Sequence, residues 1–399
     1  MSQGPLRDIR VVELASFIAG PYCGQLLADF GAEVIKIELP DSGDPMRQWG
    51  ARPGDPHSVW WSVIGRNKKS VTLDVRTPEG QRIARHLLAN ADVFVENFRP
   101  GTVEEWGLEY DRLRAINRRL VMVRISGFGQ TGPYSEKAAF GSVAEAIAGL
   151  RYLAGEPDRP PVRVGISIGD SLAGLFGALG ALAALHRRDA DGGGGQCIDV
   201  GIADSILAVL ENVVAEYARS GVARERTGAI LPGIAPSNAY PTRDGHWVVI
   251  GANADTIFRR LVQAMDRPAL LEDPRFTTHR ARGANQSELD RIIRGWTEQH
   301  DRADLLKTLD AAAVPAGPIN SARELVSDPH FLARAMIVKA ADEALGEVTM
   351  QGVVPKFTDT PASVLWPGPA LGQHNAEIFS GLLGMASTEL EELRRKRVI

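Results

Sequence analysis

Hydrophobic and polar positions follow two alternating patterns along the first part of the chain. Short β-rich runs occupy residues 9–14, 34–38, 92–96 and 120–125, and stretches with helical periodicity occupy residues 21–30 and 78–88. Thr77 suits the N-cap of the second helix, Pro78 its first turn and Glu79 its positive end. Strands that alternate with helices in this way predict βαβ units.

Such units imply an α/β fold with a mostly parallel sheet and helices on both of its faces. Ligands of these sheets bind at the carboxyl ends of the strands, so the loops after residues 14, 96 and 125 are the expected functional loops. The pattern changes from about Gly228 onward, where Pro232, Pro236 and Pro241 precede a predicted hairpin. Arg-rich helical segments follow to about residue 312, and residues 371–399 are predicted to be helical again. A second domain is therefore expected to begin near Gly228.

Composition narrows the classes of function. A chain of 399 residues with 44% hydrophobic content is long enough for two domains. Its 45 basic and 49 acidic residues are scattered, so neither nucleic acid nor an anionic membrane is an expected partner. The most apolar window, residues 172–185, is shorter than the ~20 residues of a membrane span and is interpreted as a buried helix. Because no secretory pattern is visible and Cys23 and Cys197 lack a CxxC spacing, a cytoplasmic location is expected.

The glycine-rich run Gly127–Gly132 matches GxGxxG after a predicted strand. A dinucleotide-binding turn also needs a helix that starts inside the glycines, whereas Pro133 and Tyr134 continue the loop, so NAD or FAD binding is not expected. The sequence contains no HExxH, P-loop or GxSxG motif, and its eight histidines are isolated from one another. No metal site is predicted.

Asp170 precedes a long helix rich in Gly and Ala, within the run Gly165–Ser171. It suits an N-cap, because an aspartate oxygen accepts backbone N–H bonds there. It also suits a carboxylate nucleophile, because helix-end N–H groups stabilise negative charge and small neighbours leave room for substrate. On chemistry alone, the N-cap is the favoured interpretation.

Nine strings occur in a fixed order over most of the chain. They are Ala19–Pro21, Leu27–Glu38, Gly43–Asp44, Asn67–Ser70, Leu73–Asp74, Ala91–Gly101, Gly127–Pro133, Pro161–Gly165 and Leu371–His374. Together they resemble the class III CoA-transferases, the family of formyl-CoA:oxalate and carnitine CoA-transferases. Each string is weak by itself, but their order and spacing make the resemblance specific.

The resemblance implies a large Rossmann-like domain made of residues 1–225 and 336–399, and a smaller α+β domain at residues 226–335. It implies a homodimer of two interlocked rings. The family's catalytic aspartate falls on Asp170, which reverses the preference for a simple N-cap. Coenzyme A enters as the acyl-CoA substrate, and no permanently bound cofactor is expected.

Carried over residue by residue, the CoA-contacting segments of the family fall on Ile18, Ala19, Leu73, Arg76, Asn97, Phe98 and Phe140. Two positions at which some members use a basic residue against CoA phosphate are Leu39 and Glu105 here. Arg76 and Arg99 are the natural substitutes, since a guanidinium pairs bidentately with phosphate.

In the implied mechanism, Asp170 passes through a mixed anhydride and an aspartyl-CoA thioester, with no need for ATP or metal. Backbone amides of the loop around Gly129, or of residues 232–236, are the candidates for stabilising an oxyanion. Residues 140–150 resemble members that take succinyl-CoA with small dicarboxylic acids. A distal carboxylate needs a cation, and Arg47, Arg52 and Arg66 are candidates, although each fits a solvent-exposed arginine equally well.

Two alternatives stay open at this point. The related 2-methylacyl-CoA racemases need a second acid/base group and carry a Gly-His-Asp loop, but the matching stretch here is Ala139–Gly141, and no histidine lies between His86 and His186. A non-catalytic CoA-binding protein is the other alternative, and the presence of Asp170 beside small residues argues against it.

Overall fold

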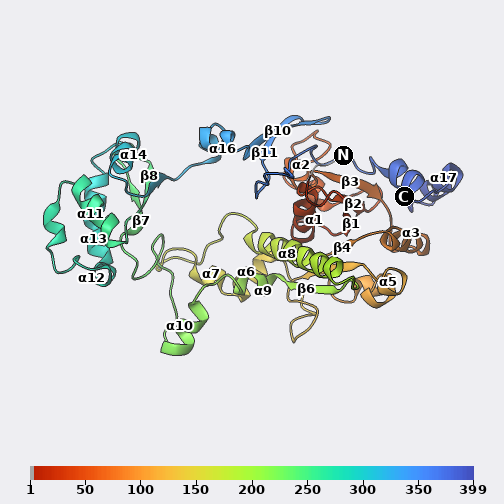
Figure 1. Ribbon diagram of the computed structural model, residues 1–399, viewed down its shortest axis with the longest axis horizontal. Helices are drawn as coiled ribbons and strands as arrows, with labels where there is room; N and C mark the ends of the chain where they lie inside the picture. The colour runs from red at the N-terminus through yellow and green to blue at the C-terminus, as the bar shows by residue number, and fades with distance from the viewer. Residues whose placement is uncertain (1–3) are drawn as a thin grey trace. The chain divides into compact units, whose positions relative to one another are not determined.

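The computed structural model describes residues 4–399, which form two compact units (Figure 1). The first unit comprises the chain up to Leu150 together with Val164–Val214 and Asp328–Ile399, and the second comprises Arg151–Arg163 and Ala215–Ser327. Residues 151–163 and 215–225, which the resemblance assigned to the large domain, cluster with the second unit, and residues 328–335, assigned to the small domain, cluster with the first. One reason is local: Arg226 donates hydrogen bonds to the carbonyls of Tyr152 and Glu156.

The first unit contains a six-stranded sheet in the order β3-β2-β1-β4-β5-β6, and every neighbouring pair of strands is parallel. The strands are β1 (Arg10–Leu14), β2 (Glu33–Glu38), β3 (Lys68–Thr72), β4 (Val93–Glu96), β5 (Val121–Ser126) and β6 (Cys197–Gly201). The predicted parallel α/β sheet is confirmed. The chain order reverses between β1 and β4, so the crevice at their carboxyl ends is the expected ligand site of such a sheet.

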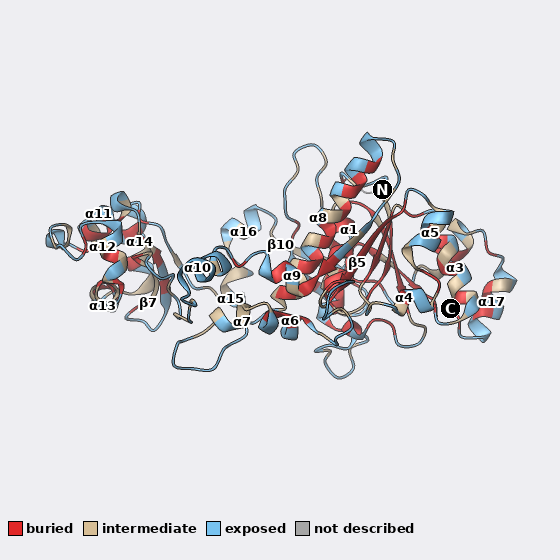
Figure 2. Cartoon of the chain, turned by 90° about the horizontal axis from the view of Figure 1, so that it is seen from below, coloured by how far each residue is buried: buried red, intermediate tan, exposed pale blue. Residues whose placement is uncertain are grey.

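Helices cover both faces of this sheet, and the two faces bury different sets of side chains (Figure 2). One face packs on α1 (Ala19–Asp29) and α8 (Ile168–Ala190), and the other packs on α3 (Pro78–Ala89), α5 (Tyr110–Ile116), the π-helical turn η3 (Ala376–Leu382) and α17 (Ser387–Arg395). Successive strand residues alternate between the faces: Val11 lies in the α1/α8 core and Val12 in the α3/α17 core.

Local signals explain where individual helices begin. The Thr77 hydroxyl accepts a hydrogen bond from the Gly80 amide at 3.0 Å, and Pro78 occupies the first turn of α3, as predicted. The remaining elements of the first unit are η1 (Pro45–Arg47), α2 (Val59–Ile64), α4 (Thr102–Glu105), α6 (Gly141–Ile147), α9 (Ile202–Leu207), α16 (Pro329–Ala333) and the antiparallel hairpin β10 (Ile337–Asp342) and β11 (Gly346–Gln351). The short helices α7 (Leu150–Leu153) and α10 (Val213–Ser220) each cross a boundary between the units.

Helix α8 is the one described helix that is long and apolar enough to cross a membrane by length and composition. In the structure it packs against α1 and β5 through small residues such as Gly174 and Gly177. A Cβ atom at Gly174 would lie 2.7 Å from the Ala19 carbonyl oxygen, so glycine permits this close approach of the two helices. The predicted buried helix is therefore a core helix with one packed face.

The second unit is an α+β unit with its own core. An antiparallel sheet in the order β7-β8-β9 packs on several helices. Its elements are β7 (Ser237–Pro241), β8 (Trp247–Gly251), α11 (Asp255–Ala264), η2 (Pro268–Leu271), α12 (His279–Ala284), α13 (Gln286–Thr297), α14 (Arg302–Ala311), β9 (Ala316–Pro318) and α15 (Ala322–Leu325). The hairpin predicted from Ala239–Tyr240 and His246–Ile250 is present as β7 and β8.

Candidate active site

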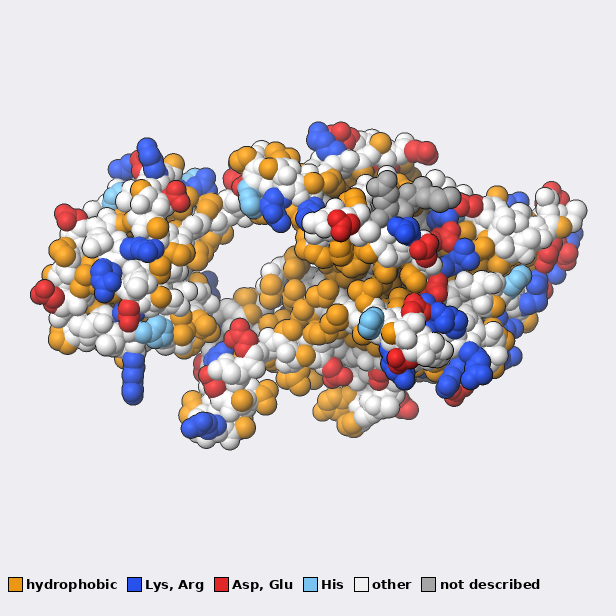
Figure 3. Space-filling view, in the orientation of Figure 1, with side chains coloured by type: hydrophobic (Ala, Val, Ile, Leu, Met, Phe, Trp, Pro, Cys, Tyr) orange, Lys and Arg blue, Asp and Glu red, His pale blue; other side chains and the backbone are white. Residues whose placement is uncertain are grey.

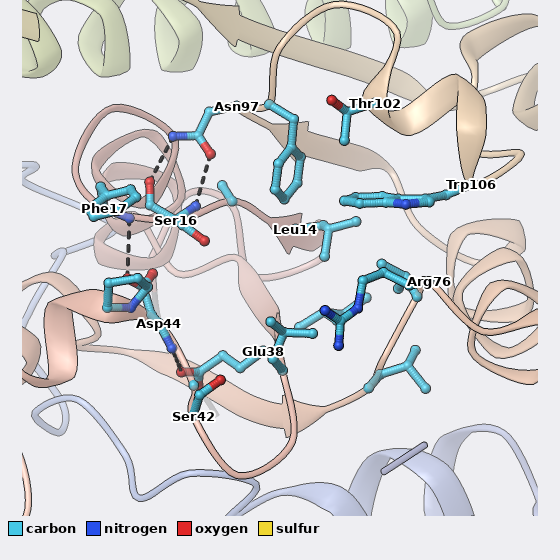
Figure 4. Close-up of a pocket in the computed structure, with 18 of the residues that line it drawn as sticks. Leu14, Ser16, Phe17, Glu38, Ser42, Asp44, Arg76, Asn97, Thr102 and Trp106 are labelled. Carbon is cyan, nitrogen blue, oxygen red and sulfur yellow. Dashed lines mark hydrogen bonds between the residues drawn. The ribbon is translucent and has the colours of Figure 1, made fainter. Parts of the chain in front are cut away.

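A cavity of about 740 Å³ opens at the carboxyl ends of β1, β2, β3 and β4 (Figure 4). We call it the strand-end cavity. Most of its lining is apolar, and its residues are Leu14, Ala15, Ser16, Phe17, Ile37, Glu38, Leu39, Ser42, Gly43, Asp44, Pro45, Gln48, Trp49, Leu73, Val75, Arg76, Asn97, Phe98, Thr102 and Trp106. Two of the three loops predicted to be functional, those after residues 14 and 96, line it.

The loop after β1 is held from two sides. The Asn97 side chain accepts a hydrogen bond from the Ser16 amide at 2.9 Å and donates one to the Ser16 carbonyl at 2.8 Å. On the other side, Asp44 Oδ1 accepts a hydrogen bond from the Phe17 amide at 3.2 Å (Figure 4). Phe17 has a φ of +65°, a left-handed conformation that side chains other than glycine rarely adopt. These contacts fix the shape of the cavity wall.

The floor of the cavity rests on Glu38, at the end of β2. Both Glu38 oxygens accept hydrogen bonds from the Arg47 guanidinium at 2.8 Å, and Oε1 also accepts one from Ser70 at 2.6 Å. The Asp44 amide donates to the same carboxylate at 2.9 Å. Because Glu38 and Arg47 are both buried, their bidentate pairing is what makes the burial of two charges tolerable.

The loop after β4 is shaped by a second buried carboxylate, Glu96. Burial raises the pKa of Glu96 to about 6, although a hydrogen bond from Arg124 at 2.7 Å works in the opposite direction. The same carboxylate accepts the Phe98 amide at 2.8 Å. This hydrogen bond holds the backbone of Asn97 and Phe98 in place along the wall of the cavity.

Asp170 occupies the third position of α8, after Ser167 as N-cap residue. The interpretation of Asp170 as an N-cap is therefore wrong. Its carboxylate lies against Gly141, the first residue of α6. A Cβ atom at Gly141 would lie 2.7 Å from Asp170 Cγ and 2.9 Å from Oδ1, and closer still to Oδ2. Only glycine leaves space for the carboxylate at this place.

Aromatic side chains connect the strand-end cavity with the neighbourhood of Asp170. The Phe17 ring lies 5.5 Å from the Trp49 ring and 6.0 Å from the Phe140 ring, centroid to centroid. Phe140 is 68% exposed and directly precedes Gly141, which contacts Asp170. The contact between Phe17 and Phe140 thus links the cavity loop to the start of α6, against which Asp170 lies.

The family model for CoA-transferase family III matches residues 6–375. The chain belongs to this family. As a family III CoA-transferase it is an enzyme, and the alternative of a non-catalytic CoA-binding protein is set aside.

The chain is 58% identical over 395 residues to the succinyl-CoA–D-citramalate CoA-transferase of Chloroflexus aurantiacus, an alignment that covers 99% of this chain and 98% of that protein. It is 37% identical over 386 residues to the succinate–glutarate CoA-transferase of Agrobacterium fabrum, with 95% of this chain and 96% of that protein covered. Among solved structures, a CAIB/BAIF family protein from Brucella suis matches with a TM-score of 0.84 and 37% identity, over 95% of this chain and 99% of that one.

The residues predicted to contact CoA divide into two groups. Leu73, Arg76, Asn97 and Phe98 line the strand-end cavity, and so does Leu39, where some family members have a basic residue. The others lie outside the cavity lining. Ile18 and Ala19 are buried at the start of α1, next to the loop after β1, and the Phe140 ring contacts Phe17 of that loop. Arg99 and Glu105 are exposed. The CoA contacts of all these residues stay predictions.

Arg76 is the one basic residue in the cavity lining, counted over the described part of the chain. Its guanidinium forms two hydrogen bonds of 2.7 Å with Asp74, and its side chain is 61% exposed. We expect Arg76→Ala to raise KM for the acyl-CoA about fivefold with little change in kcat, because a solvent-screened guanidinium contributes modestly to phosphate binding. Steady-state kinetics measures this, with Arg114→Ala, an exposed change in α5 outside the cavity lining, as the control. An unchanged KM in Arg76→Ala would contradict the assignment.

The arginines predicted to bind a distal carboxylate need correction. Arg47 is buried, and its guanidinium is taken up by Glu38 and by the Pro369 carbonyl at 3.0 Å. Arg66 is likewise buried and pairs with Asp29. Both therefore stabilise the fold instead of facing a substrate. Arg52 is exposed and keeps its place as a candidate.

Gly129 does not line the strand-end cavity. It has a φ of +82°, and the following amide, that of Gln130, donates to both oxygens of Asp199 at 3.0 and 2.9 Å. This amide is therefore occupied within the protein, which weakens the prediction that the loop stabilises an oxyanion. A bulky residue at Gly129 would strain the backbone, so its substitution is no clean test of catalysis.

Several site residues were not singled out from the sequence. Phe17, Asp44, Trp49, Trp106 and Gly141 all lie in the cavity wall or against Asp170. Asp44 and Gly141 stand in stretches that the family resemblance had marked, but nothing local assigns them a role. No group of three or more His, Cys, Asp or Glu side chains suited to a metal ion occurs within residues 4–399.

Proposed function

We propose that the chain transfers CoA from succinyl-CoA to a small dicarboxylic acid, with Asp170 as the residue that carries the acyl group and then CoA. The main support is the Asp170 carboxylate, which lies in the first turn of α8 against a residue without a side chain. The name of the 58% identical relative supports succinyl-CoA as donor and a citramalate-like acid as acceptor.

In the first step, an Asp170 carboxylate oxygen attacks the thioester carbonyl of succinyl-CoA. The carbon–sulfur bond breaks, CoA leaves as a thiolate, and Asp170 holds a mixed anhydride. The thiolate then attacks Cγ of Asp170, the anhydride carbon–oxygen bond breaks, and succinate leaves. Asp170 now carries CoA as a thioester. A thioester is already activated, so the carboxylate requires only correct placement.

The second half repeats these steps in reverse. A carboxylate of the acceptor attacks Cγ of the aspartyl thioester, and CoA again leaves as a thiolate. The thiolate attacks the acceptor acyl carbon of the new anhydride, which releases the acceptor as its CoA ester and restores the Asp170 carboxylate. One thioester replaces another, so the sequence needs no ATP and no oxidant.

We place the nucleotide end of CoA in the strand-end cavity and its thioester near Asp170. The apolar lining of Leu14, Ile37, Leu73 and Trp106 suits a purine base, and the switch point of a parallel sheet is where such ligands commonly bind. The surface formed by Phe17 and Phe140 gives the pantetheine arm an apolar path toward Asp170.

We further propose that two copies of the chain form a homodimer. Exposed apolar side chains gather over α6, α8 and α9 (Figure 3), and they include Val143, Ile147, Leu175, Leu179, Leu207 and Val209. Apolar patches of this kind mark interaction surfaces. Size-exclusion chromatography with light scattering should give twice the mass of one chain, whereas the mass of a single chain would refute the dimer.

A cytoplasmic location is also proposed. Both cysteines are free thiols, as expected in a reducing compartment, and they share no disulfide bond. Fractionation of cells that produce the protein would test the location, and recovery in a membrane or secreted fraction would contradict it.

The substrate assignment is tested with succinyl-CoA and a panel of acids: citramalate, malate, mesaconate, itaconate, glutarate and acetate. We expect CoA esters to form with the dicarboxylic acids at more than about ten times the rate seen with acetate, as a charge-assisted contact to the distal carboxylate would give. The reaction should proceed without ATP. Failure of every acid with succinyl-CoA, together with transfer from another acyl-CoA, would refute the donor assignment alone.

A further inference from the structure

A chain of buried charges runs beneath the loop after β1. Lys36, on β2, is fully buried and lies 2.8 Å from both Glu13 Oε1 and Asp44 Oδ2. Burial alone disfavours its charged form, but the Asp44 and Glu13 carboxylates raise the pKa of Lys36 above its ordinary value. The Asp44 carboxylate is therefore held in a fixed position by a buried lysine.

This chain of charges reaches the backbone of three consecutive cavity residues. Lys36 donates a hydrogen bond to the Ala15 carbonyl at 2.7 Å, Asn97 binds both backbone groups of Ser16, and Asp44 accepts the Phe17 amide. Asp44 Oδ1 also accepts the Met46 amide at 2.9 Å, which ties the cavity loop to η1.

Phe17 depends most on these hydrogen bonds, because its backbone has a left-handed conformation. A left-handed φ is unfavourable for phenylalanine and persists only where surrounding contacts over-determine it. Without the Asp44 contact, the Phe17 backbone is free to relax to an ordinary conformation. Its ring would then leave the position between Trp49 and Phe140. That position lies on the path between the strand-end cavity and Asp170.

We infer that Asp44 is a positioning residue for CoA transfer: it holds Phe17 in its left-handed conformation, and the Phe17 ring in turn aligns the acyl-CoA with the catalytic carboxylate. The inference rests on the proposed path of CoA between the cavity and Asp170. It assigns Asp44 no contact with substrate. The effect of Asp44 is exerted through Phe17 alone, and this makes the two residues one functional unit.

A double-mutant cycle on the full-length enzyme tests this inference, with the acyl-CoA and acid that the wild-type protein turns over best. Asp44→Ala and Phe17→Ala should each lower kcat about tenfold, since misplacement of a substrate-aligning group costs rate. Because they act through the same ring, the double variant should also lose only about tenfold instead of about 100-fold. Asp41→Asn, an exposed change in the same loop that suits the left-handed backbone there, should leave kcat unchanged.

Thermal unfolding of each variant is measured alongside, because a merely structural role for Asp44 would lower Tm and give multiplicative losses in the cycle. If Asp44→Ala does not fold, Asp44→Leu replaces it, since leucine is of similar size but offers no acceptor for the Phe17 amide. Multiplicative losses, or a folded Asp44 variant with wild-type kcat, would overturn the inference. Absence of transfer by the wild-type enzyme from succinyl-CoA would instead refute the proposed donor and leave the cycle measurable with another acyl-CoA.

Discussion

Asp170→Asn is expected to lower the rate of CoA transfer by about 10⁴-fold or more, a loss typical of removing the nucleophile of a covalent mechanism. Asparagine has nearly the size of aspartate, so it fits against Gly141 as the carboxylate does. Its amide is not a nucleophile and forms neither the anhydride nor the thioester. Asp170 is at the third position of α8, where loss of one charge from the helix start has a small effect on stability.

The measurement combines turnover with trapping of the intermediate. Wild-type enzyme incubated with succinyl-CoA and then with hydroxylamine or borohydride should be modified on the peptide that carries Asp170, and the variant should not. Asp111→Asn is the matched control, because Asp111 is an exposed acid in the first turn of α5. Exchange of CoA between two acids by Asp170→Asn at an ordinary rate would remove the basis of the proposed mechanism.

Strands that contain a run of consecutive apolar residues were predictable from the sequence, and β3, which lacks such a run, was not. β1, β2, β4 and β5 carry runs such as Val121–Val123 that are buried on both faces, which is the pattern of a central parallel strand. β3 begins with Lys68, whose side chain is fully buried but pairs with Glu13 at 2.7 Å. No local rule predicts a buried lysine in a strand, because its partner lies 55 positions earlier in the sequence.

In the candidate active site, too, contacts between residues far apart in the sequence could not be predicted. Asp170 was assigned as the nucleophile through the family resemblance, whereas local reasoning alone had favoured an N-cap, and its catalytic role stays a prediction. The contacts that shape the site join residues far apart: Asn97 with Ser16, Asp44 with Phe17, and Asp170 with Gly141. Arg47 illustrates the converse, since a lone arginine in a sequence does not reveal that Glu38 occupies its guanidinium. Such pairings follow only from the fold.

Gly141→Ala is expected to lower kcat about 100-fold while the protein stays folded. The added methyl group would overlap all three atoms of the Asp170 carboxylate group, which must turn away or shift. The carboxylate is the far end of a flexible side chain, so this shift costs little stability. A misplaced nucleophile nevertheless loses near-attack geometry, and misplacement by about 1 Å is enough to cost two orders of magnitude.

Two further measurements separate this effect from general damage. Affinity for CoA itself should be unchanged, because Gly141 lies outside the strand-end cavity, and trapping of Asp170 should slow in proportion to kcat. Gly295→Ala is the matched control: this glycine is also helical, and a Cβ atom there meets nothing within 4 Å, so the control should keep full activity. If Gly141→Ala turned over at the wild-type rate, the carboxylate seen against Gly141 would not be in its reacting position, and nucleophilic attack would require Asp170 to move first.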